Sequence, residues 1–269
     1  MIANQLGVMV DRIYANPAEN NTAAIAWLAS IGYTFQIYFD FSGYSDMAIG
    51  LGKMFGFDIM ENFNYPYVSK TMTEFWRRWH ISLSTWFRDY LYIPLGGNRT
   101  GNVYINLLIV FAVTGLWHGA AWNFVVWGLF HGVFILADHF MKNKHIEIKL
   151  PNVVKVFITF FIVNIGWVLF RAPSLTYAMK MFGVMLGVTH TNANGILLSW
   201  YLSPKLMFLL IVAVLASIDW QRIMPRFLNS FEGTNAQIIL KDMVMVVLLA
   251  VSIMLVITSA YNAFIYFQF

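Results

Sequence analysis

Hydrophobic positions in this chain form long runs separated by polar connections, and six of the runs are long enough to predict membrane-spanning helices. A helix needs about 20 apolar residues to cross a bilayer. The predicted spans are Ala23–Phe41, Val103–His118, Trp122–Phe140, Val153–Phe170, Leu206–Ile218 and Val244–Tyr266. The second and fifth are short, which predicts that they are tilted or partly re-entrant. The pattern therefore predicts an all-α, polytopic transmembrane protein, with residues 1–269 forming a single transmembrane domain.

Residues 74–91, EFWRRWHISLSTWFRDYL, follow a different pattern. At about 100° per residue, aromatic and aliphatic side chains fill one half of a helical wheel, while arginines and serines fill the other. Phe75, Trp79 and Trp86 lie in the apolar half, and His80 lies near its edge. A helix divided in this way lies flat at the membrane surface. We therefore expect one interfacial amphipathic helix beside the spans.

Polar residues also interrupt the N-terminal part of the chain. The segment before Ala23 carries Asp11, Arg12 and Glu19. The stretch IYFDFSGYSDMAIGLGKMFGF, residues 37–57, places Asp46 among aromatic residues and glycines. It predicts either the wall of a pocket at membrane depth or a glycine-rich turn in which Asp46 caps the next helix.

The composition supports a membrane protein. Hydrophobic residues make up 59% of the chain, charged residues only 11%, and the mean hydropathy is +0.63. A soluble domain carries about 25% charged residues, because it must cover its core with polar surface. The chain has no cysteine, which excludes disulfides, thiolate metal sites and a cysteine nucleophile.

Basic residues concentrate in three connections, residues 42–101, 141–152 and 219–241, which six spans would place on one side of the membrane. An excess of Lys and Arg marks the cytoplasmic side. We therefore assign these connections to the cytoplasm and both ends of the chain to the opposite side. The net charge of +4 is a signal of topology and gives no reason to expect nucleic acid as a partner.

His118 stands in GLWHGAAWN at the end of an apolar run, where an ionisable side chain is costly. One interpretation is a helix-end histidine whose ring rests among lipid headgroups. The small residues Gly115, Gly119 and Ala120 favour another, since they let a backbone or a substrate approach the ring. A neutral imidazole can then act as a general base, removing a proton from a hydroxyl that attacks an acyl group.

The other histidines leave alternatives open. His80 either takes part in a site or anchors the interfacial helix, and His131 is expected to be a hydrogen-bonded packing residue within the third span. The spacing of His118 and His131 does not match the i, i+3 or i, i+4 pattern of a helical metal pair, so no metal is expected. The chain also lacks the G-x-S-x-G pattern of a serine nucleophile.

Five motifs resemble one known family. They are QIYFDFSGYSDMAIGLGKMFGF (36–57), ENFNYPY (61–67), EFWRRWHISLSTWFRDYLYIPLGGNR (74–99), TGLWHGAAWNFVVWGLFHG (114–132) and FIYFQF (264–269). In order and spacing they resemble the membrane-bound O-acyltransferase superfamily. The resemblance is to its bacterial branch of alginate and peptidoglycan O-acetyltransferases, with the teichoic-acid D-alanylation transferase more distant. Such proteins carry further spanning helices before the position equivalent to Met1, so we expect this chain to be the C-terminal portion of a longer protein. The resemblance then implies that the polar segment before Ala23 is a loop between helices.

The resemblance implies that His118 is the catalytic residue and His80 a second functional histidine, in a tunnel enclosed by the spanning helices. It implies a protein of the bacterial inner membrane that moves an acetyl group to hydroxyls of an exported polysaccharide. The donor would be acetyl-CoA or a similar cytoplasmic thioester, as a substrate and not as a bound cofactor. Arg77 and Arg78 are then candidate ligands of the donor's phosphates, since arginine matches phosphate geometry. An extracytoplasmic partner protein that handles acetyl groups is also expected.

Three alternatives remain open. The first is transfer of D-alanine to teichoic acid, by a protein of the same family. The second is a transporter in which an intramembrane histidine relays protons, although the inverted repeats typical of transporters are not evident. The third is a membrane scaffold that recruits a soluble acetyl-handling partner.

Overall fold

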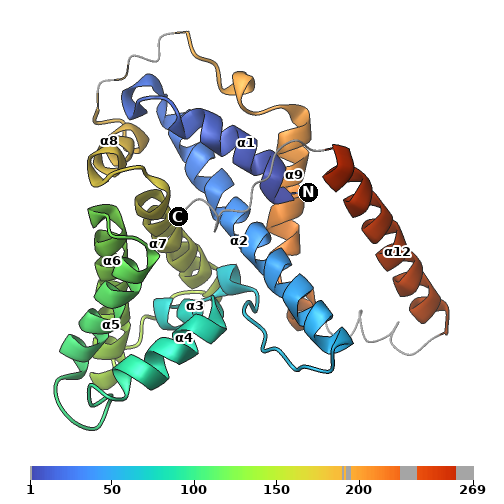
Figure 1. The fold of residues 1–269 in the computed structure, drawn as a ribbon. Coiled ribbons are helices and arrows are strands. Elements are labelled where there is room, and N and C mark those ends of the chain that lie inside the picture. Colours follow the sequence, from blue (N-terminus) through green and yellow to red (C-terminus); the bar gives the residue numbers. More distant parts are fainter. Residues whose placement is uncertain (1, 190, 192–194, 225–234, 259–269) are drawn as a thin grey trace.

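The computed structural model describes residues 2–189, 191, 195–224 and 235–258, and helices dominate this part of the chain (Figure 1). The helices are α1 Ile2–Tyr14, α2 Ala23–Met54, α3 Met72–Trp76, α4 Ile81–Phe87, α5 Val103–His118, α6 Trp122–Asn143, α7 Asn152–Arg171, α8 Leu175–Met185, α9 Pro204–Ala216, α10 Trp220–Ile223 and α12 Asn235–Thr258. Within the described residues, the only strand-like pairing is an isolated bridge between Phe63 and Trp79. The predicted all-α class is therefore confirmed.

Two of the described helices, α6 and α7, are long and apolar enough to cross a membrane, and α5 and α9 are apolar but shorter. The predicted span Ala23–Phe41 forms the first part of α2, which continues to Met54. The predicted span Val244–Tyr266 overlaps α12 as far as Thr258. The rest of that span lies outside the described residues, as does the motif at 264–269. The number of spans stays a prediction.

Helix α1 corrects the expectation of a loop before Ala23. Leu6, Val10 and Ile13 recur at helical spacing and are fully buried, and α1 packs along α2 (Figure 1). Arg12 is exposed on the other side of the helix. Arg12 therefore marks the exposed side of an amphipathic helix.

Helix α2 continues through the stretch for which a turn was one of two interpretations. It is 32 residues long and begins at Thr22, whose side chain accepts a hydrogen bond from the backbone N–H of Ile25 at 3.3 Å. Asp46 lies inside this helix, so the interpretation of Asp46 as a helix cap is wrong. Isolated glycines cost a helix about 1 kcal/mol each but do not end it.

Helices α5 and α6 form a hairpin with its backbones in close contact (Figure 1). A Cβ atom added to Gly115 would lie 2.3 Å from the carbonyl oxygen of Phe124, and one added to Gly128 would lie 2.2 Å from that of Phe111. Neither position has room for a side chain, so glycine is required for this approach. The sequence-based expectation that Gly115 admits a neighbouring backbone is therefore confirmed, and His118 lies at the tip of this hairpin.

A buried polar network joins α2 to α7. Asn164 on α7 accepts a hydrogen bond from the Ser30 hydroxyl at 2.7 Å and donates one through Nδ2 to Thr34 Oγ1 at 2.7 Å. The Tyr67 hydroxyl donates to the carbonyl oxygen of Thr34 at 2.6 Å. Ser30, Thr34 and Asn164 are at most 1% exposed. The network fixes the register of α2 against α7 and holds the segment that leads into α3 at the same point.

Candidate active site

The segment 74–91 is not one helix, as the sequence predicted, but two short helices separated by a break at His80. The backbone of His80 is left-handed, with φ 46° and ψ 57°. The segment around Asn62 pairs with the break: Ile81 N–H donates to the carbonyl oxygen of Asn62, and Asn64 N–H donates to that of Arg78, each at 3.0 Å. The prediction failed because these partners come from a distant part of the chain and compete with the helical hydrogen bonds.

The Asn62 side chain completes the break. Its Oδ1 accepts hydrogen bonds from Ser82 Oγ at 2.6 Å and from Ser82 N–H at 3.1 Å, and it lies 3.4 Å from Nδ1 of His80. The break also turns Trp79 inward, where it is 3% exposed and its ring lies 4.9 Å from that of Trp167 on α7. A left-handed residue other than glycine costs about 1 kcal/mol or more, and such strain gathers at functional sites.

The His80 ring is held inside the protein. It meets Phe41 of α2 edge to face, with ring centroids 4.6 Å apart. Burial, and to a smaller extent the charge of nearby His118, lowers the pKa of His80 to about 3. The ring is therefore neutral near pH 7 and can donate or accept a hydrogen bond. The structure thus brings His80 and His118, which are far apart in the sequence, into one region.

The His118 ring turns toward α6 and α7 and is partly buried. Its centroid lies 5.2 Å from the ring of Trp127 and 5.2 Å from that of Phe170, both edge to face. The neighbouring Trp117 is 56% exposed, and its ring also lies edge to face with that of His118, with centroids 4.9 Å apart. An imidazole that packs against interior rings fits a site within the bundle better than a position among lipid headgroups.

His131 is a packing residue, as expected, but without the expected hydrogen bond. It is 0% exposed, and its ring lies 5.2 Å from the rings of both Trp76 and Trp127. Neither ring nitrogen has a hydrogen-bond partner among the described residues. A Cβ atom on Gly166 would lie 2.5 Å from its Nε2, so α7 presses directly on the ring.

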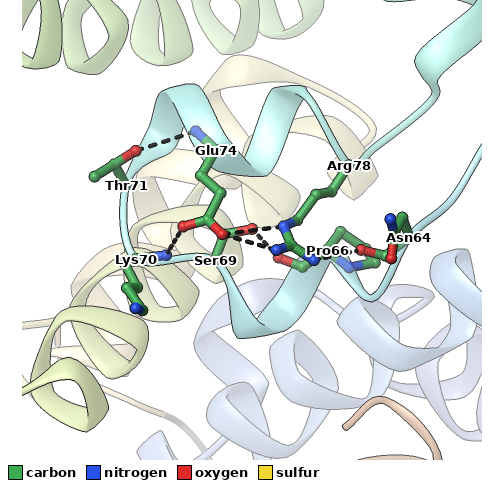
Figure 2. Close-up of polar contacts among 7 residues, drawn as sticks. All are labelled: Asn64, Pro66, Ser69, Lys70, Thr71, Glu74 and Arg78. Carbon is green, nitrogen blue, oxygen red and sulfur yellow. Dashed lines mark hydrogen bonds and ion pairs between the residues drawn. The ribbon is translucent and has the colours of Figure 1, made fainter. Parts of the chain in front are cut away.

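Arg78, one of the two arginines expected at the donor site, is held by other parts of the protein (Figure 2). Its Nε and Nη2 donate to Glu74 Oε1 at 3.1 and 2.9 Å, and its Nη1 donates to the carbonyl oxygen of Asn64 at 3.0 Å. Glu74 Oε2 also accepts from Lys70 N–H at 2.8 Å. Arg78 therefore fastens the segment before α3 to the break at His80.

Arg77 lies at a basic pocket. A pocket of about 490 Å³ opens between α3 and the facing ends of α6 and α7. Basic side chains from four positions line it together with apolar ones: Lys70, Arg77, Lys142 and Lys155. Its one acidic lining residue, Asp138, accepts hydrogen bonds from Thr73 N–H at 2.8 Å and from Thr73 Oγ1 at 2.9 Å. Arg77 was predicted from the sequence, but the three lysines were not, because their only signal was their position in or near the basic connections.

A second pocket adjoins the basic one, on the side nearer to His118. It has a volume of about 260 Å³, lies between α3–α4 and α5, and shares Thr73 and Arg77 with the basic pocket. Thr114 lines it, one helical turn before His118 on α5. One turn of an α-helix rises about 5.4 Å. The two pockets therefore share a wall at Thr73 and Arg77, and the second one lies closer to His118 than the lysines do. Among the described residues, no three histidine or acidic side chains lie together as metal ligands would.

The fold and site define a class: a helical protein with two helices long and apolar enough to cross a membrane, in which His80 and His118 lie in one region at a close-packed hairpin. The chain belongs to the membrane-bound O-acyltransferase family, which residues 8–150 match.

Three relatives illustrate the range of the family. A probable alginate O-acetylase, AlgI, of Pseudomonas putida is 52% identical over 186 residues, which cover 68% of this chain and 38% of the relative. A peptidoglycan O-acetyltransferase of Helicobacter pylori is 46% identical over 167 residues, or 61% of this chain and 32% of the relative. A teichoic acid D-alanyltransferase of Bacillus subtilis is 34% identical over 154 residues, or 52% of this chain and 39% of the relative. The chain therefore spans between 32% and 39% of the length of these relatives.

Proposed function

We propose that the protein containing this chain is a multi-pass O-acyltransferase of the bacterial inner membrane. It transfers an acetyl group from a cytoplasmic thioester, such as acetyl-CoA, to hydroxyls of an exported polysaccharide that is alginate-like or peptidoglycan. The names of two relatives, an alginate O-acetylase and a peptidoglycan O-acetyltransferase, support this substrate class. An extracytoplasmic partner protein that handles acetyl groups completes the proposal.

The observation that carries the proposal is the place of the His118 ring, packed between interior aromatic rings at the tip of the α5–α6 hairpin. In the proposed reaction a nitrogen of neutral His118 accepts the proton of the acceptor hydroxyl. The oxygen then forms a bond to the thioester carbonyl carbon, and the carbon–sulfur bond breaks. The imidazolium returns its proton to the leaving thiolate, so His118 ends as it began. A positioned general base of this kind contributes about 10²–10⁴-fold to the rate.

His80 has a positioning role in this proposal. Its depressed pKa keeps it neutral, so it acts through hydrogen bonding and not as a charge. Asn62 and the left-handed backbone hold its ring in one place. It orders the acceptor or the donor carbonyl beside His118.

We place the donor in the two adjacent pockets, with the side chains between them moving aside when it binds. The phosphates of a coenzyme A thioester lie at the basic pocket, where Arg77 and the three lysines supply positive charge. The acyl-carrying arm follows the smaller pocket toward Thr114 and His118. Since Arg78 is engaged by Glu74 and Asn64, we assign phosphate binding to Arg77 and give Arg78 a structural role.

Transfer of D-alanine is the second candidate, because one relative is a teichoic acid D-alanyltransferase. Both candidates use the same general-base chemistry and differ in the acyl group. Mass analysis of the ester-linked groups released from the cell surface by mild base separates acetate from D-alanine.

The test of the proposal is His118→Ala in the natural protein, expressed in its own membranes with whatever sequence flanks this chain in its gene. Ester-linked acetate on the exported polymer should fall by at least about 100-fold. His145→Ala, a change at an exposed histidine, is the matched control and should leave acetylation unchanged. Equal amounts of each variant in the membrane exclude a folding defect. Acetylation that persists in His118→Ala would rule out His118 as the base.

A further inference from the structure

A third pocket lies at the opposite end of the α6–α7 pair from the basic pocket. It has a volume of about 250 Å³ and lies between α1, α2, the start of α6 and the end of α7. The basic pocket is lined by the C-terminal part of α6 and the N-terminal part of α7, whereas this one is lined by Asn123 on α6 and Arg171 on α7. These helices run in opposite directions and are more than 18 residues long. On α7, residues 155–162 line the basic pocket and lie 9 to 16 positions before Arg171, so at about 1.5 Å per residue the two pockets are separated by about 14–24 Å along the helix.

Two buried amide oxygens at this pocket have no donor. Gln36 is 3% exposed and Asn123 is 2% exposed, and both line the pocket. Gln36 Oε1 and Asn123 Oδ1 have no hydrogen-bond partner among the described residues. The orientation of Asn123 is fixed, because its Nδ2 donates to the carbonyl oxygens of Ala172 at 3.0 Å and Leu169 at 3.4 Å. A buried acceptor without a partner costs about 1–3 kcal/mol, so an O–H donor that reaches either oxygen through a small shift of the pocket wall recovers this energy.

The remaining walls narrow the class of ligand. Arg171 Nη2 donates to Asp11 Oδ1 at 2.5 Å, so the two charges in the pocket neutralise each other and do not select an anion. Tyr33, Phe124 and Phe170 supply aromatic surface. The pocket is smaller than a site for a drug-sized ligand, which has a volume of about 300–1,000 Å³. Its walls offer amide oxygens, one ion pair and aromatic faces. Such a pocket suits a single small ring that carries several hydroxyls.

The pocket is one side chain away from the candidate base. Phe170 lines it, and the same Phe170 ring packs on His118 with centroids 5.2 Å apart. Phe124 also lines it and packs on Phe170. A small ligand ring bound in this pocket has its hydroxyls next to the Phe170 side chain, and His118 lies on the other side of that side chain.

We infer that this pocket, built around Gln36 and Asn123, binds a neutral sugar ring and presents its hydroxyls on the side of His118 remote from the donor pocket. The inference rests on the proposed function, because it assigns the acceptor side of the same site. Binding of a sugar requires no acyl donor, so it is measured independently of transfer.

The test is saturation-transfer NMR on the purified natural protein in detergent, with glucose, N-acetylglucosamine and N-acetylserinamide as separate probes. The sugars should give transfer signals with the unaltered protein that fall at least 10-fold in Gln36→Met, about the effect of losing 1.4 kcal/mol. The matched control is Asn106→Leu, which replaces a buried amide on α5 outside this pocket and should keep the signal. Because Gln36 Oε1 has no partner to lose, Gln36→Met should unfold at the same temperature as the unaltered protein or higher. Gln36→Leu repeats the test with a second apolar side chain.

Each outcome decides the inference. Sugar signals that are unchanged in both Gln36 variants would overturn it, as would a signal from N-acetylserinamide alone, which would mark a site for a hydroxyl of a partner protein. His118→Ala should keep the sugar signal, because His118 lies behind Phe170 and not in the pocket. Sugar binding combined with persistent acetylation in His118→Ala would refute the proposed mechanism and leave the sugar site standing.

Discussion

Replacing Asn164 by Leu should show how much the buried network between α2 and α7 stabilises the fold. Asn164 joins Ser30 and Thr34 through two hydrogen bonds of 2.7 Å, and the substitution removes both. Hydrogen bonds between helices in a membrane are worth about 0.6 kcal/mol on average and about 1.7 kcal/mol at most. Two such bonds give an expected loss of about 1–3 kcal/mol. Ser30 keeps a local alternative, since a helical serine can donate to a carbonyl four residues earlier, which limits the loss.

The assay is thermal unfolding in detergent, followed by tryptophan fluorescence, on the unaltered chain and on Asn164→Leu, Ser30→Ala and the double variant. Because Asn164→Leu already removes the partner of Ser30, the double variant should lose at least about 0.5 kcal/mol less than the sum of the single variants. Asn152→Leu, at an exposed amide on the same helix, is the control and should change stability by no more than about 0.5 kcal/mol. Strictly additive losses, or an Asn164→Leu protein as stable as the unaltered one, would refute the reasoning.

Two further predictions concern steric contact and the donor. Gly166→Ala would place a Cβ atom 2.5 Å from His131 Nε2 and should lower stability by about 1–3 kcal/mol. Gly50→Ala, with nothing within 4 Å of the added atom, should raise it by about 0.5–1 kcal/mol; equal effects on the two unfolding temperatures would contradict the steric account. Arg77→Ala should raise the apparent KM for acetyl-CoA by about 10- to 100-fold with little change in kcat, as expected for a lost charge-assisted hydrogen bond. Arg78→Ala should instead lower the unfolding temperature, and a KM effect confined to Arg78→Ala would reverse the assignment.

The helices that the sequence predicted best are those that local composition determines. The predicted span Val103–His118 matches α5 at both ends, and Trp122–Phe140 and Val153–Phe170 match α6 and α7 within three residues. Each is an apolar run bounded by polar or turn-forming residues, such as Asn102, whose side chain accepts from the N–H of Tyr104 at 3.0 Å. Burial in lipid or in a protein core requires the same residue types, so the pattern is reliable in either setting.

The site was harder to predict, because its geometry depends on contacts between distant segments. No local feature of residues 74–91 indicates that the helix breaks at His80, since the break depends on Asn62, 18 residues earlier. The same holds for Arg78, whose guanidinium also donates to Asn64, 14 residues away. The hydrophobic pattern therefore predicted the side of the helix on which Trp79 lies, but not that it would reach Trp167 on α7.

The close contact of α5 with α6 has a consequence for how substrates enter. Two helices whose main chains touch at Gly115 and Gly128 cannot slide or separate by small steps without losing the whole seam. The hairpin that carries His118 is therefore the rigid part of the site. Opening and closing around the imidazole must come from the facing helix α7, where a single aromatic ring such as that of Phe170 can change rotamer without a change in the backbone.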